Sequence, residues 1–210
     1  MRIKDTYENT IVIQKSEFIT RLFRVNSIEE VEEKLAYVRK KHYDARHNCY
    51  AYILGDNQEI QKASDDGEPS KTAGAPMLDV LKKNNMTNIL AIVTRYFGGI
   101  LLGAGGLVRA YSSSVSECLK LAKLYDTKMQ AKFTLTISYP SYNTLLKVFP
   151  YIHIEDQAFM EDVILTGSCN LDKYASLKED LYKYKISADT LTLLGEFQIE
   201  VPIEWNKSEN

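Results

Sequence analysis

The sequence has little cysteine, proline or tryptophan. Its 210 residues include three cysteines, five prolines and one tryptophan. Cys49, Cys118 and Cys169 are odd in number, lie far apart and never form a CxxC pair. This spacing argues against both a disulfide framework and a zinc site built from cysteine pairs. We therefore expect three reduced, mostly buried thiols.

Long apolar segments are also missing. No run approaches the roughly 18 apolar residues that a membrane-spanning helix requires. The first ten residues, MRIKDTYENT, lack the apolar centre of a signal peptide. With 45% hydrophobic and 26% charged residues, the composition is that of an ordinary globular protein. We expect a cytoplasmic protein without membrane association, long enough for one large core or two of roughly 100 residues each.

The chain has no strong excess of either charge sign, since its net charge is −2. This argues against a protein that coats nucleic acid by bulk charge. Residues 1–130 hold 19 Lys and Arg against 16 Asp and Glu (+3), whereas residues 131–210 hold 7 against 12 (−5). The segment from Val80 to Ser116 contains no acidic residue. Such a basic segment in a nearly neutral protein favours a specific anion over a long polyanion.

Glycine is concentrated in one segment. Residues 95–109, RYFGGILLGAGGLVR, contain five of the ten glycines within nine positions. Such a cluster predicts turns with positive φ, tight chain packing, or a loop whose N–H groups face a ligand. The known phosphate motifs do not decide among these three, because GxxxxGK[ST] is absent and Val108 replaces the third glycine of GxGxxG.

We expect an anion-binding site at the start of the helix that follows these glycines. A helix beginning near Gly105 would provide unpaired N–H groups and the positive end of its dipole. Arg109 in the first turn opposes that dipole by roughly 0.3–1 kcal/mol, and a bound anion would relieve the conflict. The alternative is that the glycines only allow close packing. The residues expected to bind an anion or nucleic acid are Arg46, Lys71, Arg95, Gly98, Gly99, Gly103, Gly105, Gly106 and Arg109.

Two other groups of residues could carry chemistry. Strand alternation places His47 and Cys49 on one face, but no third orienting group can be assigned, so we favour a buried structural cysteine over a nucleophile. Asp65, Asp66 and Glu68 offer oxygen ligands for Mg²⁺, although an acidic surface turn is the preferred interpretation. We therefore expect no metal and no cofactor, and we assign no catalytic residue.

Apolar periodicity predicts alternating strands and helices in the first part of the chain. One helix there should be capped by Asn26 or Ser27 and bury one apolar stripe formed by Ile28, Val31, Leu35 and Val38. The other predicted elements are strands Thr10–Gln14 and Glu17–Val25 with a turn at Lys15–Ser16, strand Cys49–Leu54, loop Gly55–Lys71, helix Ala75–Lys83, strand Asn88–Thr94, buried on both faces, and helix Leu107–Ala122.

The second part predicts the order β-α-β-β-α-β, which is typical of a ferredoxin-like split βαβ domain. We place the boundary near Asp126–Ala131, giving domains 1–128 and 129–210 of an α+β protein built from two-layer sandwiches. The predicted elements are strand Lys132–Tyr139, helix Ser141–Phe149, strands Tyr151–Ala158 and Glu161–Cys169, helix Leu171–Lys185 and strand Leu191–Val201.

Two segments, SDDGEPSKTAGAPML at 64–78 and NILAIVTRYFGGILLGAGGLVRAY at 88–111, share a long pattern with a known family. In this pattern a glycine precedes an apolar pair, and a second apolar pair precedes an Arg–aromatic–aromatic–Gly–Gly block. The pattern resembles that of the YigZ/IMPACT family. The matching positions are Gly74, Met77, Leu78, Ile92, Val93, Arg95, Tyr96, Phe97, Gly98, Gly99 and Gly103.

The resemblance implies that residues 1 to about 128 are similar to domain 2 of ribosomal protein S5. It implies a ferredoxin-like second domain similar to domain V of elongation factor G. Eukaryotic relatives act as translational regulators by binding a partner protein in the stress-kinase pathway. They carry a different accessory domain, so that partner is not transferred to this chain, and the family implies no established reaction.

We therefore expect a translation-associated regulatory protein that is not an enzyme and that contacts RNA phosphate or a ribosomal component through a cationic glycine-rich loop. One alternative is a phosphate-handling enzyme that uses the same loop, with metal held by Asp65, Asp66 and Glu68. Another is a protein-interaction module whose loop only shapes a docking surface. Salt dependence distinguishes the first from the third, and metal-dependent nucleotide turnover would identify the second. The sequence does not assign an oligomeric state.

Overall fold

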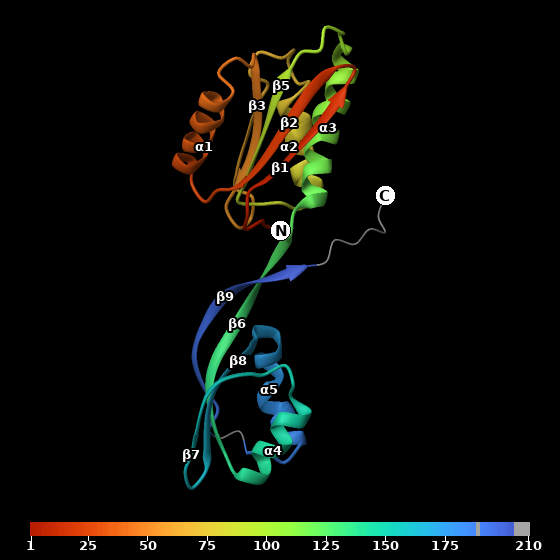
Figure 1. The fold of residues 1–210 in the computed structure, drawn as a ribbon. Helices are drawn as coiled ribbons and strands as arrows, with labels where there is room; N and C mark the ends of the chain where they lie inside the picture. Colours follow the sequence, from red (N-terminus) through yellow and green to blue (C-terminus); the bar gives the residue numbers. More distant parts are fainter. Residues whose placement is uncertain (188–189, 204–210) are drawn as a thin grey trace. The chain divides into compact units, whose positions relative to one another are not determined.

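The computed structural model describes residues 1–187 and 190–203, which form two compact units. The first unit comprises Met1–Asp126 with Pro202 and Ile203, and the second comprises Thr127–Val201. Each unit combines one sheet with helices (Figure 1), which confirms the predicted α+β class. None of the helices in the described ranges is long and apolar enough to span a membrane.

The first unit contains a five-stranded sheet in the order β1-β2-β5-β3-β4, in which all neighbouring strands are antiparallel. Its strands are β1 (Tyr7–Ile13), β2 (Ser16–Arg24), β3 (His47–Leu54), β4 (Ile60–Ser64) and β5 (Ile89–Tyr96). Its helices are α1 (Ile28–Lys41), α2 (Gly74–Lys83) and α3 (Gly103–Leu121).

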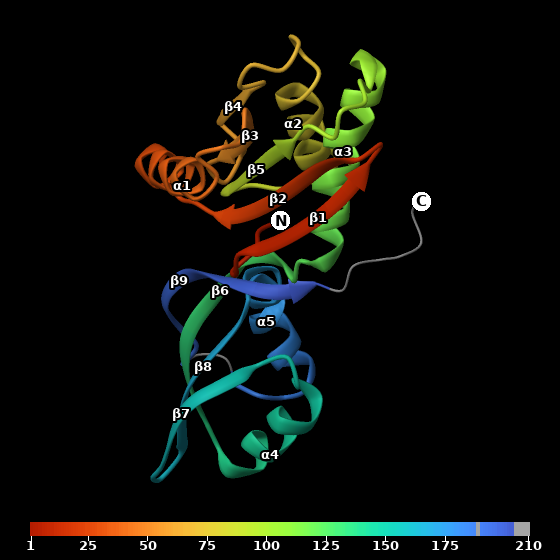
Figure 2. The same cartoon turned by 45° about the horizontal axis from the view of Figure 1, so that its top comes forward.

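Helices cover both faces of this sheet, so the first unit has a third layer in addition to the two that we expected (Figures 1 and 2). Helix α1 packs Val31, Leu35 and Val38 on one face, and α2 and α3 cover the other. Strand alternation directs successive side chains of the central strand β5 to opposite cores, as predicted from its apolar sequence. Ile28, which was predicted to lie in the same buried stripe of α1, is instead 42% exposed.

Local sequence signals can be compared with the structure at three places in this unit. The Ser27 hydroxyl caps α1 by accepting a hydrogen bond from the Glu30 N–H at 3.3 Å, as predicted. The hairpin turn lies at Gln14–Lys15, one residue earlier than predicted, and both residues have positive φ. The predicted loop Gly55–Lys71 was wrong in part, because it contains β4, an exposed edge strand paired with β3.

The second unit has the predicted β-α-β-β-α-β order, and its sheet order is β7-β8-β6-β9. Strand β6 begins in the first unit, so the predicted boundary Asp126–Ala131 falls within a strand. Independent folding of 1–128 and 129–210 remains a prediction. The elements are β6 (Leu124–Ile137), α4 (Tyr139–Val148), β7 (His153–Phe159), β8 (Val163–Asn170), α5 (Leu171–Lys183) and β9 (Thr192–Ile203).

Candidate functional site

A groove of about 810 Å³ lies in the first unit, where β5 leads into α3. Its walls come from the segment that enters β3, the loop between β4 and α2, and the segment between β5 and α3. The lining residues are Asp44, Arg46, His47, Gly67, Glu68, Pro69, Arg95, Tyr96, Phe97, Leu101, Leu102, Gly103, Ala104 and Leu107.

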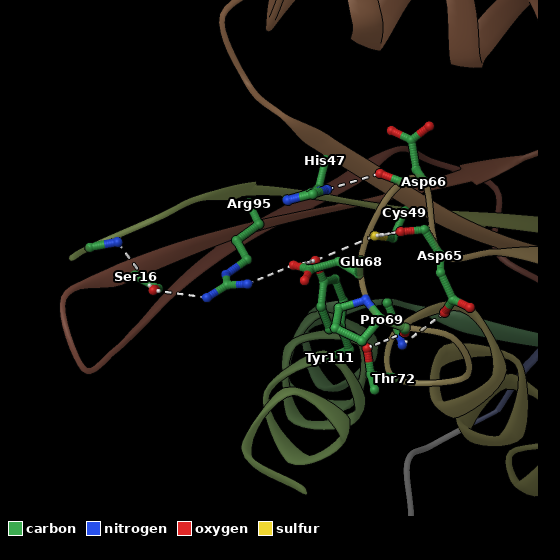
Figure 3. Close-up of polar contacts among 12 residues, drawn as sticks. Ser16, His47, Cys49, Asp65, Asp66, Glu68, Pro69, Thr72, Arg95 and Tyr111 are labelled. Carbon is green, nitrogen blue, oxygen red and sulfur yellow. Dashed lines mark hydrogen bonds and ion pairs between the residues drawn. The ribbon is translucent and has the colours of Figure 1, made fainter. Parts of the chain in front are cut away.

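A buried ion pair joins two walls of the groove (Figure 3). Arg95 Nη1 lies 2.7 Å from Glu68 Oε1, and the two side chains are 7% and 3% exposed. The Tyr111 hydroxyl donates to the same oxygen at 2.8 Å, and Arg95 also donates to Ser16 Oγ at 3.4 Å. Glu68 therefore balances the charge of Arg95, and a role of Arg95 in binding an anion remains a prediction.

The other acidic residues of the β4–α2 loop are engaged separately. Asp65 accepts hydrogen bonds from the N–H groups of Lys71, Ala73 and Gly74 at 2.8, 3.0 and 2.8 Å, and so caps α2 from a distance. Asp66 accepts from the Asn48 N–H at 2.7 Å. These carboxylates serve different partners, and the described residues contain no cluster of three metal-ligating groups. Asp65, Asp66 and Glu68 therefore do not form the metal site that the alternative interpretation, a phosphate-handling enzyme, requires.

The capping role of Asp65 makes stability depend on pH. Burial raises the pKa of Asp65, but the three backbone N–H groups lower it more, so the pKa lies below its ordinary value. A lowered carboxyl pKa stabilises the folded state above the unfolded-state pKa of about 3.9, and this contribution is lost as pH falls through the folded pKa. We expect Asp65→Asn to cost about 1–2 kcal/mol of unfolding free energy at neutral pH.

Urea denaturation of parent and Asp65→Asn proteins at neutral pH and at about pH 3 measures this contribution. The difference between the two proteins should shrink at the lower pH, because protonation removes the charge that the variant already lacks. A difference that stayed constant across this range would show that the Asp65 charge does not stabilise α2.

Cys49 and His47 do not form a nucleophilic pair. The His47 Nδ1 atom lies 2.9 Å from the Asp66 carbonyl oxygen, whereas the Cys49 thiol donates to the Asp65 carbonyl at 2.9 Å. Burial raises the pKa of Cys49 to about 12, so the thiol stays protonated at neutral pH. All three cysteines are buried and unpaired, as predicted.

The clustered glycines meet several different requirements. Helix α3 begins at Gly103, before both predicted starts, near Gly105 and at Leu107, so three of the glycines lie in its first turn. Gly99 and Gly103 have φ angles of +84° and +68°, which favour glycine. A Cβ atom on Gly98 would lie 1.9 Å from the carbonyl carbon of Lys15, so Gly98 allows the β1–β2 turn to approach. A Cβ on Gly105 would meet only Arg109 Nη1, at 3.8 Å.

The structure does not bring all of the predicted anion-binding residues together. Arg46 and Gly103 line the groove, beside the start of α3, whose first turn has no side-chain cap among the described residues. Arg109 is exposed on α3, and Lys71 lines a different cavity. Gly98, Gly99, Gly105 and Gly106 are close in sequence but do not line the groove. Among the predicted basic residues, only Arg46 both lines the groove and takes part in no ion pair within residues 1–187 and 190–203.

Sequence reasoning missed several residues that build or border this site. Ser16 holds the glycine segment by accepting a hydrogen bond from the Gly98 N–H at 3.2 Å, and the Tyr111 hydroxyl donates to Glu68. Phe97 and Leu101 are 54% and 86% exposed at the groove. Large apolar side chains in a glycine-rich loop were a signal that could have identified this surface.

The chain is similar to several known proteins. Residues 14–119 match the Impact N-terminal domain. IMPACT family member YvyE of Bacillus subtilis is 43% identical over 177 residues, 84% of this chain and 80% of YvyE. IMPACT family member YigZ of Escherichia coli is 42% identical over 129 residues, 60% of this chain and 63% of YigZ. A crystal structure of a hypothetical protein is 33% identical, has a TM-score of 0.57, and is matched over 92% of this chain and 95% of that one. The predicted resemblance is confirmed, and the chain belongs to the IMPACT family.

Proposed function

We propose that the protein is a translation-associated regulatory protein that binds RNA in the groove of its first unit. Membership of the IMPACT family supports the regulatory part, since eukaryotic relatives are expected to regulate translation. The family resemblance also implies that both units are similar to parts of the translation machinery, which is support by analogy. The physical argument for RNA rests on the groove itself.

One observation carries the proposal: an exposed aromatic ring, an arginine without an ion-pair partner and an uncapped helix start occur together at the groove. Phe97 offers a ring on which an unpaired base can stack. Arg46 and the first-turn N–H groups of α3 offer donors to a phosphate. These are the two contacts that proteins use for single-stranded RNA, and about 810 Å³ is enough for a small ligand group.

The two alternatives have less support. The phosphate-handling enzyme needs carboxylates that converge on a metal, whereas Asp65, Asp66 and Glu68 bind separate groups of the protein itself. A pure protein-interaction module would use the exposed Phe97 and Leu101 but would need neither Arg46 nor the free helix start. Salt dependence distinguishes this module from an RNA-binding protein.

We expect Arg46→Ala to weaken the binding of a labelled RNA oligonucleotide about ten- to hundredfold, because a hydrogen bond to a charged group contributes about 1.5–3 kcal/mol. Fluorescence anisotropy at low and high salt is the measurement, and parent binding should fall steeply as salt rises. Arg46 is exposed, so the melting temperature should change little. Lys62→Ala, which removes an exposed charge from β4 outside the groove, is the control. Binding that is equal in the Arg46 and Lys62 variants would contradict the proposal, and binding that is insensitive to salt would favour the protein-interaction module.

A further inference from the structure

A second cavity, of about 400 Å³, lies between α2 and α3. Its lining includes Lys71, Asp79 and Lys83 from α2 and the segment before it, and Ser112 from α3. Arg109 lies on α3 one turn before Ser112, and its Nη1 is 3.8 Å from where a Gly105 Cβ would be. The guanidinium group therefore extends back over the first turn of α3. We call these five residues, Lys71, Asp79, Lys83, Arg109 and Ser112, the α2–α3 surface.

The bases of this surface are not neutralised by the protein. Lys71, Lys83 and Arg109 take part in no ion pair within the part of the chain that the structure describes. Asp79 is the one acid among the five, which leaves a charge of +2. The whole segment from Val80 to Ser116 lacks acidic residues. A cluster of unpaired bases attracts anions and is complementary to a chain of phosphates.

The α2–α3 surface offers no ring for a base. Tyr111 is the only aromatic residue of α2 and α3, and it is fully buried. Base stacking is therefore absent, and charge alone would hold a ligand here, so the fitting chemistry is a sugar-phosphate backbone without regard to sequence.

Helix α3 connects this surface with the groove. Gly103, Ala104 and Leu107 line the groove, whereas Val108 and Ser112 line the α2–α3 cavity. With roughly 3.6 residues per helical turn, Val108 and Ser112 lie between the groove-lining side of α3 and Arg109, so a strand that leaves the groove would cross the cavity and then meet Arg109. We propose that the α2–α3 surface binds backbone phosphates of the RNA strand whose nucleotide occupies the groove. This inference rests on the RNA-binding function proposed above.

The test compares two single-stranded RNA lengths, about 4 and about 12 nucleotides, so that the shorter one fits the groove alone. In Lys71→Ala/Lys83→Ala/Arg109→Ala, the longer RNA should bind at least about tenfold more weakly at low salt. Its salt slope should fall by about 2, since each phosphate contact on a single strand contributes about 0.7. The affinity for the shorter RNA should stay close to that of the parent.

A second variant reverses the sign of the effect. Asp79→Asn removes the single acid from the surface and should strengthen binding of the longer RNA by about two- to fivefold, because it removes repulsion from the phosphates. Asp79 is exposed and makes no side-chain hydrogen bond within residues 1–187 and 190–203, so this variant should fold normally. It tests the proposal even if the triple variant fails to fold.

The matched control is Lys40→Ala/Lys62→Ala/Lys123→Ala, which removes the same charge from exposed positions outside both surfaces and should keep a salt slope near that of the parent. An unchanged salt slope in the α2–α3 triple variant, or no gain in affinity for the longer RNA in Asp79→Asn, overturns this inference. If the parent still binds the shorter RNA, the groove proposal stays intact. A parent that binds neither RNA overturns both.

Discussion

Glu68→Gln should lower the free energy of unfolding by about 3–5 kcal/mol, because it leaves the buried Arg95 charge without its counterion. Glutamine has nearly the same shape as glutamate, so the loss reports the charge rather than a cavity. Arg95 would keep its contact with Ser16 and its positions 5.4 Å and 5.7 Å from the ring centroids of Phe18 and Phe97, none of which carries a negative charge. Chemical denaturation of the whole chain measures the change.

The matched control for this variant is Glu117→Gln. Glu117 pairs with Lys120 at 2.8 Å, but these side chains are 48% and 41% exposed, so the change should cost less than about 1 kcal/mol. Replacing both buried partners, as in Glu68→Leu/Arg95→Met, should recover part of the loss because no charge is then left buried. Equal stability of Glu68→Gln and Glu117→Gln would show that the buried pair does not hold the groove walls together.

Gly98→Ala should cost at least about 3 kcal/mol of unfolding free energy, because its Cβ would overlap the backbone of the β1–β2 turn. The overlapping atoms are the carbonyl carbon and oxygen of Lys15, at 1.9 and 2.0 Å, and the Ser16 nitrogen, at 2.3 Å. Backbone atoms cannot move aside as the end of a flexible side chain can. The hydrogen bond from the Gly98 N–H to Ser16 Oγ would be lost with the same displacement.

Gly105→Ala is the matched control in the same glycine cluster. Its Cβ would make only an ordinary van der Waals contact, 3.8 Å from Arg109 Nη1, so alanine in the first turn of α3 should stabilise the protein by up to about 0.5–1 kcal/mol. Thermal denaturation of both variants beside the parent would reveal the opposite signs. Similar changes at the two positions would mean that close approach of the hairpin is not what requires Gly98.

Local sequence patterns were sufficient to predict the elements whose burial follows from the residues of a single segment. The apolar stripe of α1 and the doubly buried β5 were predicted because each depends on periodicity within one segment. Strand β4 was missed because Ile60–Ser64 is an exposed edge strand with no apolar alternation. The start of α3 was misplaced because glycine disfavours helix, whereas the structure includes Gly103, Gly105 and Gly106 in the first turn of α3.

The candidate site was harder to predict because its contacts join distant segments. Arg95 lies 27 positions from Glu68 and 79 from Ser16, and no local pattern reveals such pairs. The sequence identified Arg95 and Gly98 as distinctive, but the structure assigns them to an ion pair and to hairpin packing. Arg46 directly precedes a strand whose position was predicted well, and it lines the groove, but its role in binding an anion remains a prediction.

The most direct test of the central claim is to find where RNA touches the chain. Ultraviolet crosslinking of the full-length protein to a short single-stranded RNA, followed by mass spectrometry, identifies the residues that contact bases. We expect crosslinks at Tyr96 or Phe97, which line the groove, and we expect them to decrease when Arg46 is replaced by alanine. Crosslinks confined to the second unit, Thr127–Val201, would contradict the account.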